Sequence, residues 1–243
     1  MKIDHLRKLH QKKYRQESGL FLIEGEHLLL ELERTALDGC TIYVTERHKE
    51  WQSRFPVKLI SERQMAQTSE TRSPQGLLAT VPMDALSNST LAVTSDSDAK
   101  PAERCVYLYE VQDPGNLGTI LRTLAWFGNW RCLLSPNSVD PFNSKAIRSS
   151  MGAIFHVPLE LGVPLEAIEQ RFSSVATLDM NGKPLTEAAS QPHDCLVFGN
   201  EARGVPQQAL PDSVAPYTIP GSGLIESLNL ASAVNMAVYE LSR

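Results

Sequence analysis

Short apolar runs alternate with stretches of helical periodicity along most of the chain. In the first third, the apolar runs are bounded by glycine, proline or polar residues, and the first helical stretch carries four leucines within residues 28–32. The strands predicted there are 19–25, 41–45, 57–61 and 76–82, and the helices are 26–35 and 62–68. This alternation predicts a small α/β domain over residues 1–82.

The alternation breaks at residues 83–102, where Asp, Ser, Asn, Thr and Lys replace most apolar positions. Such a composition is typical of a linker. We therefore predict a domain boundary there, followed by a second domain over residues 103–243.

From Arg104 the alternation resumes in longer units. The strands predicted are 105–111, 130–134, 174–178, 195–199 and 217–219, and the helices are 117–127, 144–151, 164–172 and 228–241. This order predicts a doubly wound α/β domain with a mostly parallel sheet. Ligands of such sheets bind beyond the carboxyl ends of the strands, which makes the loops after Val111, Gly199 and Ile219 the candidate site.

The loop after Ile219 is rich in glycine and serine and leads into the last predicted helix. Either Ser227 or Asn229 is suited to cap that helix. A strand, a flexible loop and a helix N-terminus in this order form a concave site lined by free backbone N–H and C=O groups.

The loop after Val111 has the turn sequence Asp-Pro-Gly-Asn, in which Asn116 is a suitable N-cap. Arg122 follows on the helix, at one edge of an apolar stripe. Such an arginine most often pairs with a carboxylate or extends its stem along the core. The functional alternative is a guanidinium directed at a phosphate or a developing oxyanion.

The loop after Gly199 places amide, carboxylate and guanidinium groups between Gly199 and Gly204. It lacks the Lys-Ser/Thr of a phosphate-binding P-loop and the tighter glycine spacing of a dinucleotide fingerprint. Nothing in it indicates ATP or NAD.

Composition and charge narrow the function classes only slightly. No apolar run approaches the roughly 20 residues of a membrane span, and the N-terminus lacks the apolar core of a signal peptide. Four widely spaced cysteines predict buried thiols and a cytoplasmic protein.

The net charge is −5, yet residues 1–15 carry six basic side chains against one acidic residue. This basic arm is either a solvated helix face or a surface that neutralises several phosphates of a nucleic acid.

The three loops, taken in order, resemble the three motifs of the SpoU/TrmH branch of the SPOUT RNA methyltransferases. The matching segments are Asp-Pro-Gly-Asn-Leu-Gly…Arg-Thr (113–123), Gly-Asn-Glu-Ala-Arg-Gly-Val (199–205) and Ile-Pro…Glu-Ser-Leu-Asn-Leu (219–230). The resemblance extends through 139–153, and residues 12–26 and 73–79 resemble the family's N-terminal substrate-binding domain. Nearly the whole chain is therefore covered.

The resemblance implies an α/β SPOUT domain with a parallel sheet and a deep trefoil knot, preceded by a small ribosomal-protein-like α/β domain that binds the substrate. It implies methyl transfer from S-adenosylmethionine to a ribose 2′-hydroxyl of RNA, with ribosomal RNA ahead of transfer RNA. It also implies a homodimer whose active sites lie at the interface, without a metal; His156 and His193 have no partners at ligand spacing.

The family's functional positions transfer to this chain residue by residue. Catalytic groups correspond to Asn116, Arg122, Glu201, Ser227 and Asn229. The cofactor pocket corresponds to Thr177, Leu178, Gly199, Asn200, Gly204, Ile219 and Leu228. Candidate RNA-binding residues are Lys12, Lys13, Arg15, Lys145 and Arg148.

Two alternatives stay open at this point. One is a catalytically idle RNA-binding or ribosome-assembly protein on the same fold, which loss of cofactor binding would favour. The other is a different SPOUT reaction such as base methylation, which the position of the methyl group on the product would reveal.

Overall fold

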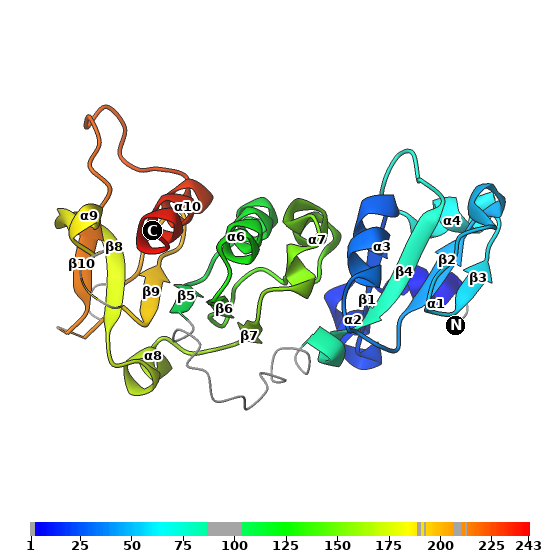
Figure 1. Cartoon of the computed structure of the whole chain (residues 1–243), viewed down its shortest axis with the longest axis horizontal. Helices are drawn as coiled ribbons and strands as arrows, with labels where there is room; N and C mark the ends of the chain where they lie inside the picture. The colour runs from blue at the N-terminus through cyan, green and yellow to red at the C-terminus, as the bar shows by residue number, and fades with distance from the viewer. Residues whose placement is uncertain (1–2, 87–103, 189–190, 192, 207–209, 212) are drawn as a thin grey trace. The chain divides into compact units, whose positions relative to one another are not determined.

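The computed structural model of the chain describes residues 3–86, 104–188, 191, 193–206, 210–211 and 213–243 (Figure 1). From residue 87 on, the predicted linker at 83–102 lies outside the described residues. The described residues form two compact units. The N-terminal unit comprises those within Met1–Thr94 and Asp140–His156, and the C-terminal unit those within Ser95–Val139 and Val157–Arg243. Residues 140–156 therefore pack with the N-terminal unit, although they follow the second domain's first strands in sequence.

The N-terminal unit is built on a four-stranded mixed sheet in the order β1-β4-β2-β3. Its elements are α1 (Ile3–Lys8), α2 (Lys12–Ser18), β1 (Leu20–Glu24), α3 (Glu26–Glu33), β2 (Thr41–Val44), the 3₁₀ turn Glu46–His48, β3 (Val57–Leu59), α4 (Glu62–Thr68), β4 (Leu77–Pro82), α7 (Ser144–Ser150) and the 3₁₀ turn Ala153–Phe155. The strands and helices predicted between residues 19 and 82 are confirmed, and no end is shifted by more than two residues.

The basic N-terminal arm is folded rather than extended. Leu6 of the first helix and Leu9, which directly follows it, are buried in a core cluster with Tyr43, Met65 and Leu78. Burial of these leucines stabilises helices that are too short to persist alone. The exposed lysines of the arm therefore project from a fixed surface.

The C-terminal unit contains a six-stranded, all-parallel sheet in the order β10-β8-β9-β5-β6-β7. Its elements are β5 (Arg104–Leu108), α6 (Pro114–Phe127), β6 (Trp130–Leu134), β7 (Leu159–Leu161), α8 (Glu166–Arg171), β8 (Val175–Pro184), α9 (Leu185–Ala188), β9 (Cys195–Phe198), β10 (Ala215–Thr218) and α10 (Leu230–Leu241). The predicted parallel α/β sheet is confirmed. Prediction missed β7 and α9, which are too short to establish a period.

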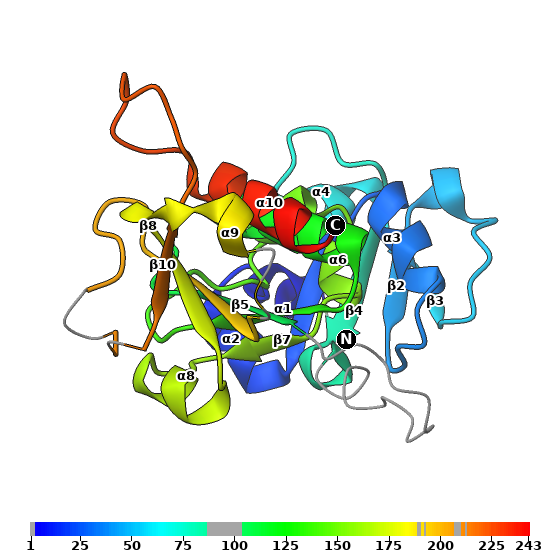
Figure 2. The ribbon, with the colours of Figure 1, turned by 60° about the vertical axis from the view of Figure 1, so that its left-hand side comes forward.

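Helices α6 and α10 pack against each other on one face of this sheet, and α8 covers the other face (Figures 1 and 2). The core on the α8 side contains Tyr107, Leu133, Ile168 and Val197. The four cysteines are free and buried, as predicted, and burial raises the pKa of the Cys132 thiol to about 12. No described helix is long and apolar enough to cross a membrane.

The N-caps of α6 and α10 differ in how they compare with the sequence predictions: the cap predicted for α6 is wrong, and one of the two residues proposed for α10 is the cap. Helix α6 begins at Pro114, and its N-cap is Asp113, whose carboxylate accepts from the Asn116 backbone N–H at 2.9 Å. Asn116 is therefore inside the helix rather than its cap, which leaves its amide side chain available for other contacts. At α10 the cap is Asn229, not Ser227, and its Oδ1 accepts from the Ser232 N–H at 3.2 Å.

Strands β8 and β10 approach each other unusually closely. Their register shifts between Pro216 and Tyr217, so that Pro216 pairs with Thr177 but Tyr217 pairs with Lys183. The intervening residues of β8 bulge outwards. A Cβ on Gly182 would lie 2.5 Å from the Tyr217 carbonyl carbon, and only glycine permits that approach.

Candidate active site

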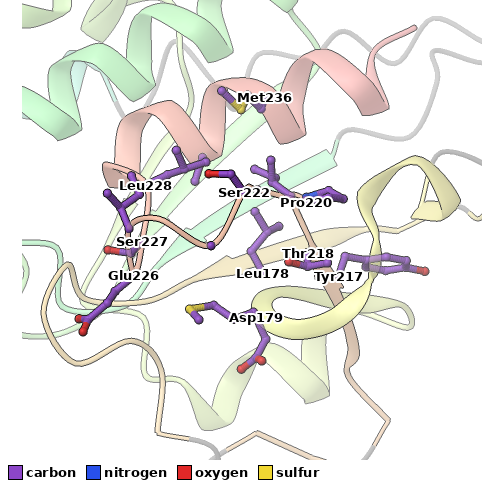
Figure 3. Close-up of a pocket in the computed structure, with 16 residues that line it drawn as sticks. Leu178, Asp179, Tyr217, Thr218, Pro220, Ser222, Glu226, Ser227, Leu228 and Met236 are labelled. Carbon is purple, nitrogen blue, oxygen red and sulfur yellow. The ribbon is translucent and has the colours of Figure 1, made fainter.

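A pocket of about 650 Å³ opens between the bulge of β8, the end of β10 and the loop that leads to α10. That loop, residues 219–229, projects away from the sheet (Figures 1 and 2). Figure 3 shows Met236 on the α10 side of the pocket and Leu178 and Thr218 on the strand side. The pocket therefore lies at the carboxyl edge of the sheet, where parallel α/β domains bind ligands.

The lining of the pocket combines apolar side chains, loop backbone and two carboxylates. Leu178, Ile219, Leu228 and Met236 supply apolar surface, while residues 220–223 supply backbone groups and little side-chain bulk. Asp179 and Glu226 are the charged residues of the lining, and none of the described residues that line it is a lysine or an arginine. A ligand with phosphate groups would meet like charge here, whereas a cationic ligand with an adenine ring and a ribose fits both the charge and the surface.

Three side chains next to the pocket form a continuous hydrogen-bonded relay. The Asn116 side-chain amide donates to Glu201 Oε1 at 3.2 Å, and the Asn229 amide donates to Asn116 Oδ1 at 2.9 Å. Asn229 Oδ1 then caps α10. The relay joins the three loops that contain the sequence motifs, and it ends one residue from Leu228 in the pocket wall.

The two ends of the relay fix the orientation of both amides. Glu201 also accepts from the backbone N–H groups of Gln112 and Asp113, each at 3.2 Å. Burial by itself would raise the pKa of Glu201, but these hydrogen bonds, with those from its own N–H and from Asn116, hold the pKa below its ordinary value. An ionised carboxylate only accepts, so Asn116 must present its NH₂ group to Glu201 and its oxygen to Asn229.

The loop between Gly199 and Gly204 is held by Asn200. Its Oδ1 accepts from the backbone N–H groups of Ala202 and Arg203, and its amide donates to the Glu110 carbonyl at 2.8 Å. A Cβ on Gly199 would lie 2.2 Å from the Gly204 carbonyl carbon, so this crossing requires glycine. The loop is thereby rigid enough to hold Glu201 in place.

The predicted cofactor residues fall into two groups. Leu178, Ile219 and Leu228 line the pocket. The other four support it from outside the lining: Thr177 is buried with its hydroxyl bonded to the Val197 carbonyl at 3.0 Å, and Gly199, Asn200 and Gly204 shape the adjacent loop.

The predicted catalytic residues are brought to one side of the C-terminal unit. Ser227 lines the pocket, and Asn116, Glu201 and Asn229 form the relay. Arg122 lies on the exposed surface of α6, and within the described part of the chain its guanidinium has no hydrogen bond or ion pair. Of the two structural alternatives for Arg122, pairing with a carboxylate is not seen among the described residues.

Of the five residues predicted to bind RNA, four are exposed: Lys12, Lys13, Lys145 and Arg148. Arg15 is a correction, because only 3% of its surface is exposed. Its guanidinium donates to Asp140 Oδ2 at 2.6 Å and to the Leu9 and His10 carbonyls at 2.8 and 2.7 Å. Arg15 therefore fastens residues 140–156 to the N-terminal arm and offers nothing to RNA.

Sequence reasoning missed the two carboxylates of the pocket, Asp179 and Glu226. Asp179 lies in the bulge of β8, where the alternation of a regular strand gives no indication of which way a side chain points. Glu226 directly precedes Ser227, so the third motif itself was a signal for it. No group of histidine, cysteine or acidic residues in the described chain could hold a metal ion.

Comparison with known proteins gives a consistent result. The profile of the SpoU rRNA Methylase family matches residues 103–239, and that of the MRM3-like substrate binding domain matches residues 1–79. Relatives include the 23S rRNA (guanosine(2553)-2′-O)-methyltransferase RlmP of Bacillus subtilis, 31% identical over 99% of this chain and 95% of that protein.

Solved structures agree with these matches. A TrmH-family protein from Porphyromonas gingivalis has a TM-score of 0.79 and 30% identity, over 98% of this chain and 96% of that one. An AdoMet-bound rRNA methyltransferase from Sinorhizobium meliloti also has a TM-score of 0.79, with 25% identity over 98% of this chain and 93% of that one.

Proposed function

The chain belongs to the SpoU rRNA methylase family, and from that premise we propose that its RNA 2′-O-methyltransferase activity modifies ribosomal RNA. The observation that carries the proposal is a pocket whose described lining residues include no lysine or arginine and which is joined through Leu228 and Asn229 to the relay of the three motifs. The B. subtilis relative, which aligns over almost the full length of the chain, modifies a guanosine of 23S rRNA.

S-adenosylmethionine is the methyl donor of the reaction, and its sulfonium supplies an electrophilic methyl group. The residues of this chain fit it: Leu178, Ile219 and Leu228 would clasp the adenine faces, and loop backbone would read its edge. Asp179 and Glu226 would face the positive charges of the cofactor. These roles are consistent with the absence of lysine and arginine from the lining.

A ribose hydroxyl is a weak nucleophile, so the site must orient it and assist the loss of its proton. We assign orientation to Arg122, which would bind a phosphate beside the target ribose through paired N–H donors and polarise the hydroxyl through it. An arginine side chain keeps its proton in proteins, so this residue does not act as a free base. Asn116, held by Glu201 and Asn229, would position the ribose, with Ser227 at the pocket wall.

Exposed apolar side chains on α6, α10 and the preceding loop support a homodimer. Trp126, Met236 and Tyr239 are 84%, 46% and 55% exposed, and Leu224 and Ile225 project from the loop. A patch of this kind beside a ligand pocket is typical of an interface. Trp126 is four residues from Arg122 and shares its face of α6, so a second copy covering Trp126 would bring its own pocket towards Arg122.

The close crossings of the C-terminal unit support the trefoil knot that the family resemblance implies. Two backbone approaches are so close that a side chain would block them. One brings β8 against β10 at Gly182, and the other closes the 199–204 loop at Gly199. A chain threaded through its own loop needs such crossings, and we propose that these glycines line the threaded segment. Four free, buried cysteines likewise support a cytoplasmic location.

The test is calorimetric titration of S-adenosylmethionine into the purified protein, with its mass determined in solution. We expect about one cofactor per chain in a dimer. A well-folded dimer that binds no cofactor would favour an idle RNA-binding protein instead. Asp179→Asn and Glu226→Gln should each weaken cofactor binding, whereas Glu169→Gln, on exposed α8 outside the pocket, should leave it unchanged.

A further inference from the structure

A second cleft, of about 420 Å³, lies wholly within the N-terminal unit. Its walls come from the turn between β1 and α3, from the loop 71–75 and from the end of α7. None of these residues belongs to the pocket of the C-terminal unit, and the three motifs leave the cleft unexplained.

The cleft is held open by a fixed wall centred on Gln75. Its Oε1 accepts from the Glu26 backbone N–H at 2.9 Å, and its carbonyl oxygen lies 2.8 Å from His48 Nε2. Gly25 has φ +100°, and a Cβ there would approach Gln75 Oε1 to 3.0 Å. The positive φ favours glycine at this position. Because the carboxamide oxygen is bonded to Glu26, the Gln75 NH₂ group remains available to a ligand.

The opposite wall is formed by α7. The Met151 carbonyl lies 3.2 Å from His27 Nε2, which ties the end of α7 to α3. Met151 has a φ of +50°, which is uncommon for a residue other than glycine. Its apolar side chain is also 45% exposed. Arg148, one turn earlier, is exposed on the same wall.

Several polar groups of the cleft have no partner among the described residues. These are the Gln75 amide nitrogen and the Arg148 guanidinium, which donate, and the Glu26 carboxylate, which accepts. The other acid, Glu24, is already bonded to the hydroxyls of Ser69 and Thr71 at 2.5 and 2.7 Å. The cleft thus offers donors, one free acceptor and the apolar Met151 side chain, and its two carboxylates outnumber its one guanidinium.

This combination matches a nucleobase rather than a phosphate. A phosphate would be repelled by Glu26, whereas an unstacked base has donors and acceptors on its edge and apolar faces for Met151. We propose that the cleft binds one unpaired base of the RNA substrate. The inference rests on the proposed function and adds a site that reads the RNA away from the methyl-transfer pocket.

The test compares full-length Met151→Ala and Arg148→Gln with wild type and with Arg63→Gln, whose arginine is exposed on α4 outside the cleft. The probe is ribosomal RNA extracted from a strain lacking the gene. RNA affinity is measured by filter binding at several salt concentrations, S-adenosylmethionine affinity by calorimetry and folding by thermal unfolding. We expect both cleft variants to bind RNA at least about tenfold more weakly, with cofactor affinity and folding unchanged and Arg63→Gln like wild type.

The outcomes separate the cleft from the function. If both variants bind RNA like wild type, the cleft has no role and the methyltransferase proposal stands. If Met151→Ala is silent and Arg148→Gln lowers only the salt slope, by about one, the cleft touches a phosphate and the base proposal fails. If wild type binds S-adenosylmethionine but not this RNA, the proposed substrate fails first.

Discussion

Glu201 has the most clearly defined task of any side chain in the candidate site, because its charge orients Asn116 and, through it, Asn229. Replacing Glu201 by Gln keeps the shape but supplies an NH₂ group where three donors converge. We expect kcat/KM to fall about 100-fold, roughly 3 kcal/mol, while S-adenosylmethionine affinity changes less than about threefold. Steady-state methyl transfer with Glu169→Gln as control measures this. A variant with wild-type turnover would remove the relay from the mechanism.

Substitution of Arg122 tests whether bidentate recognition of a phosphate by a planar guanidinium matters. Lysine keeps the charge but loses the fork of N–H donors, so Arg122→Lys should lower kcat by about tenfold or more on the true substrate. Cofactor binding should persist. Wild-type turnover by this variant would contradict bidentate phosphate recognition, leaving only a general attraction for RNA.

His193 predicts how stability depends on pH. It is buried between the Ser174 hydroxyl and the Tyr217 hydroxyl, each 3.0 Å from a ring nitrogen. Burial lowers the pKa of His193, with Arg104 acting in the same direction and Asp194 opposing it. The unfolded state then binds the proton more readily, so stability present above the ordinary pKa of about 6.5 is lost as pH falls below it.

The measurement is urea unfolding of wild type and His193→Gln between pH 7.5 and about 5.5, spanning the ordinary histidine pKa. The variant should be less stable at neutral pH but should lose less stability on acidification. Parallel pH curves for the two proteins would show that His193 does not contribute to the dependence.

At the scale of elements, the start of α10 combines two functions that substitutions can separate. Asn229→Asp keeps the cap acceptor but loses the NH₂ donor to Asn116, whereas Asn229→Ala loses both. We expect Asn229→Ala to cost about 1 kcal/mol of stability and both variants to lose activity. If Asn229→Asp were as active as wild type, the cap alone would explain why asparagine is needed.

Helices and strands could be predicted where local sequence signals, such as apolar runs and capping residues, determine them. The parallel strands followed from apolar runs, and the α10 cap was one of two residues with the right chemistry. The exchange of Asn116 for Asp113 as the α6 cap depended on Pro114, which fits the first helical turn and moves the start three residues earlier. Arg15 could not be recognised as structural, because its partner Asp140 lies 125 residues away.

The same limit applies to the site. The family resemblance predicted the relay residues but only four residues of the pocket lining: Leu178, Ile219, Ser227 and Leu228. Each motif follows a strand, and parallel strands end at one edge of the sheet. Asp179 could not be placed in the pocket from the sequence, because its position depends on the register shift between β8 and β10. That shift arises from the tertiary crossing of the two strands rather than from a local pattern. The cleft of the N-terminal unit required α7 to pack beside β1, although α7 is distant in sequence.

At the scale of the whole molecule, the exposed apolar face of α6 and α10 predicts the assembly. Trp126→Asp should convert the proposed dimer to monomers, because a charge in a buried interface is strongly unfavourable. Solution mass and activity should fall together, and Leu30→Asp, an exposed leucine on α3 of the N-terminal unit, is the control. An active monomer would contradict a site shared between subunits.

The most direct measurement is methyl transfer from labelled S-adenosylmethionine to ribosomal RNA of a strain lacking the gene, with the modified nucleotide then located. We predict one labelled nucleotide that resists alkaline cleavage on its 3′ side, because a methylated 2′-oxygen cannot attack the adjacent phosphate. Label on a base, or none with RNA and cofactor both bound, would contradict ribose 2′-O-methylation as the reaction of this site.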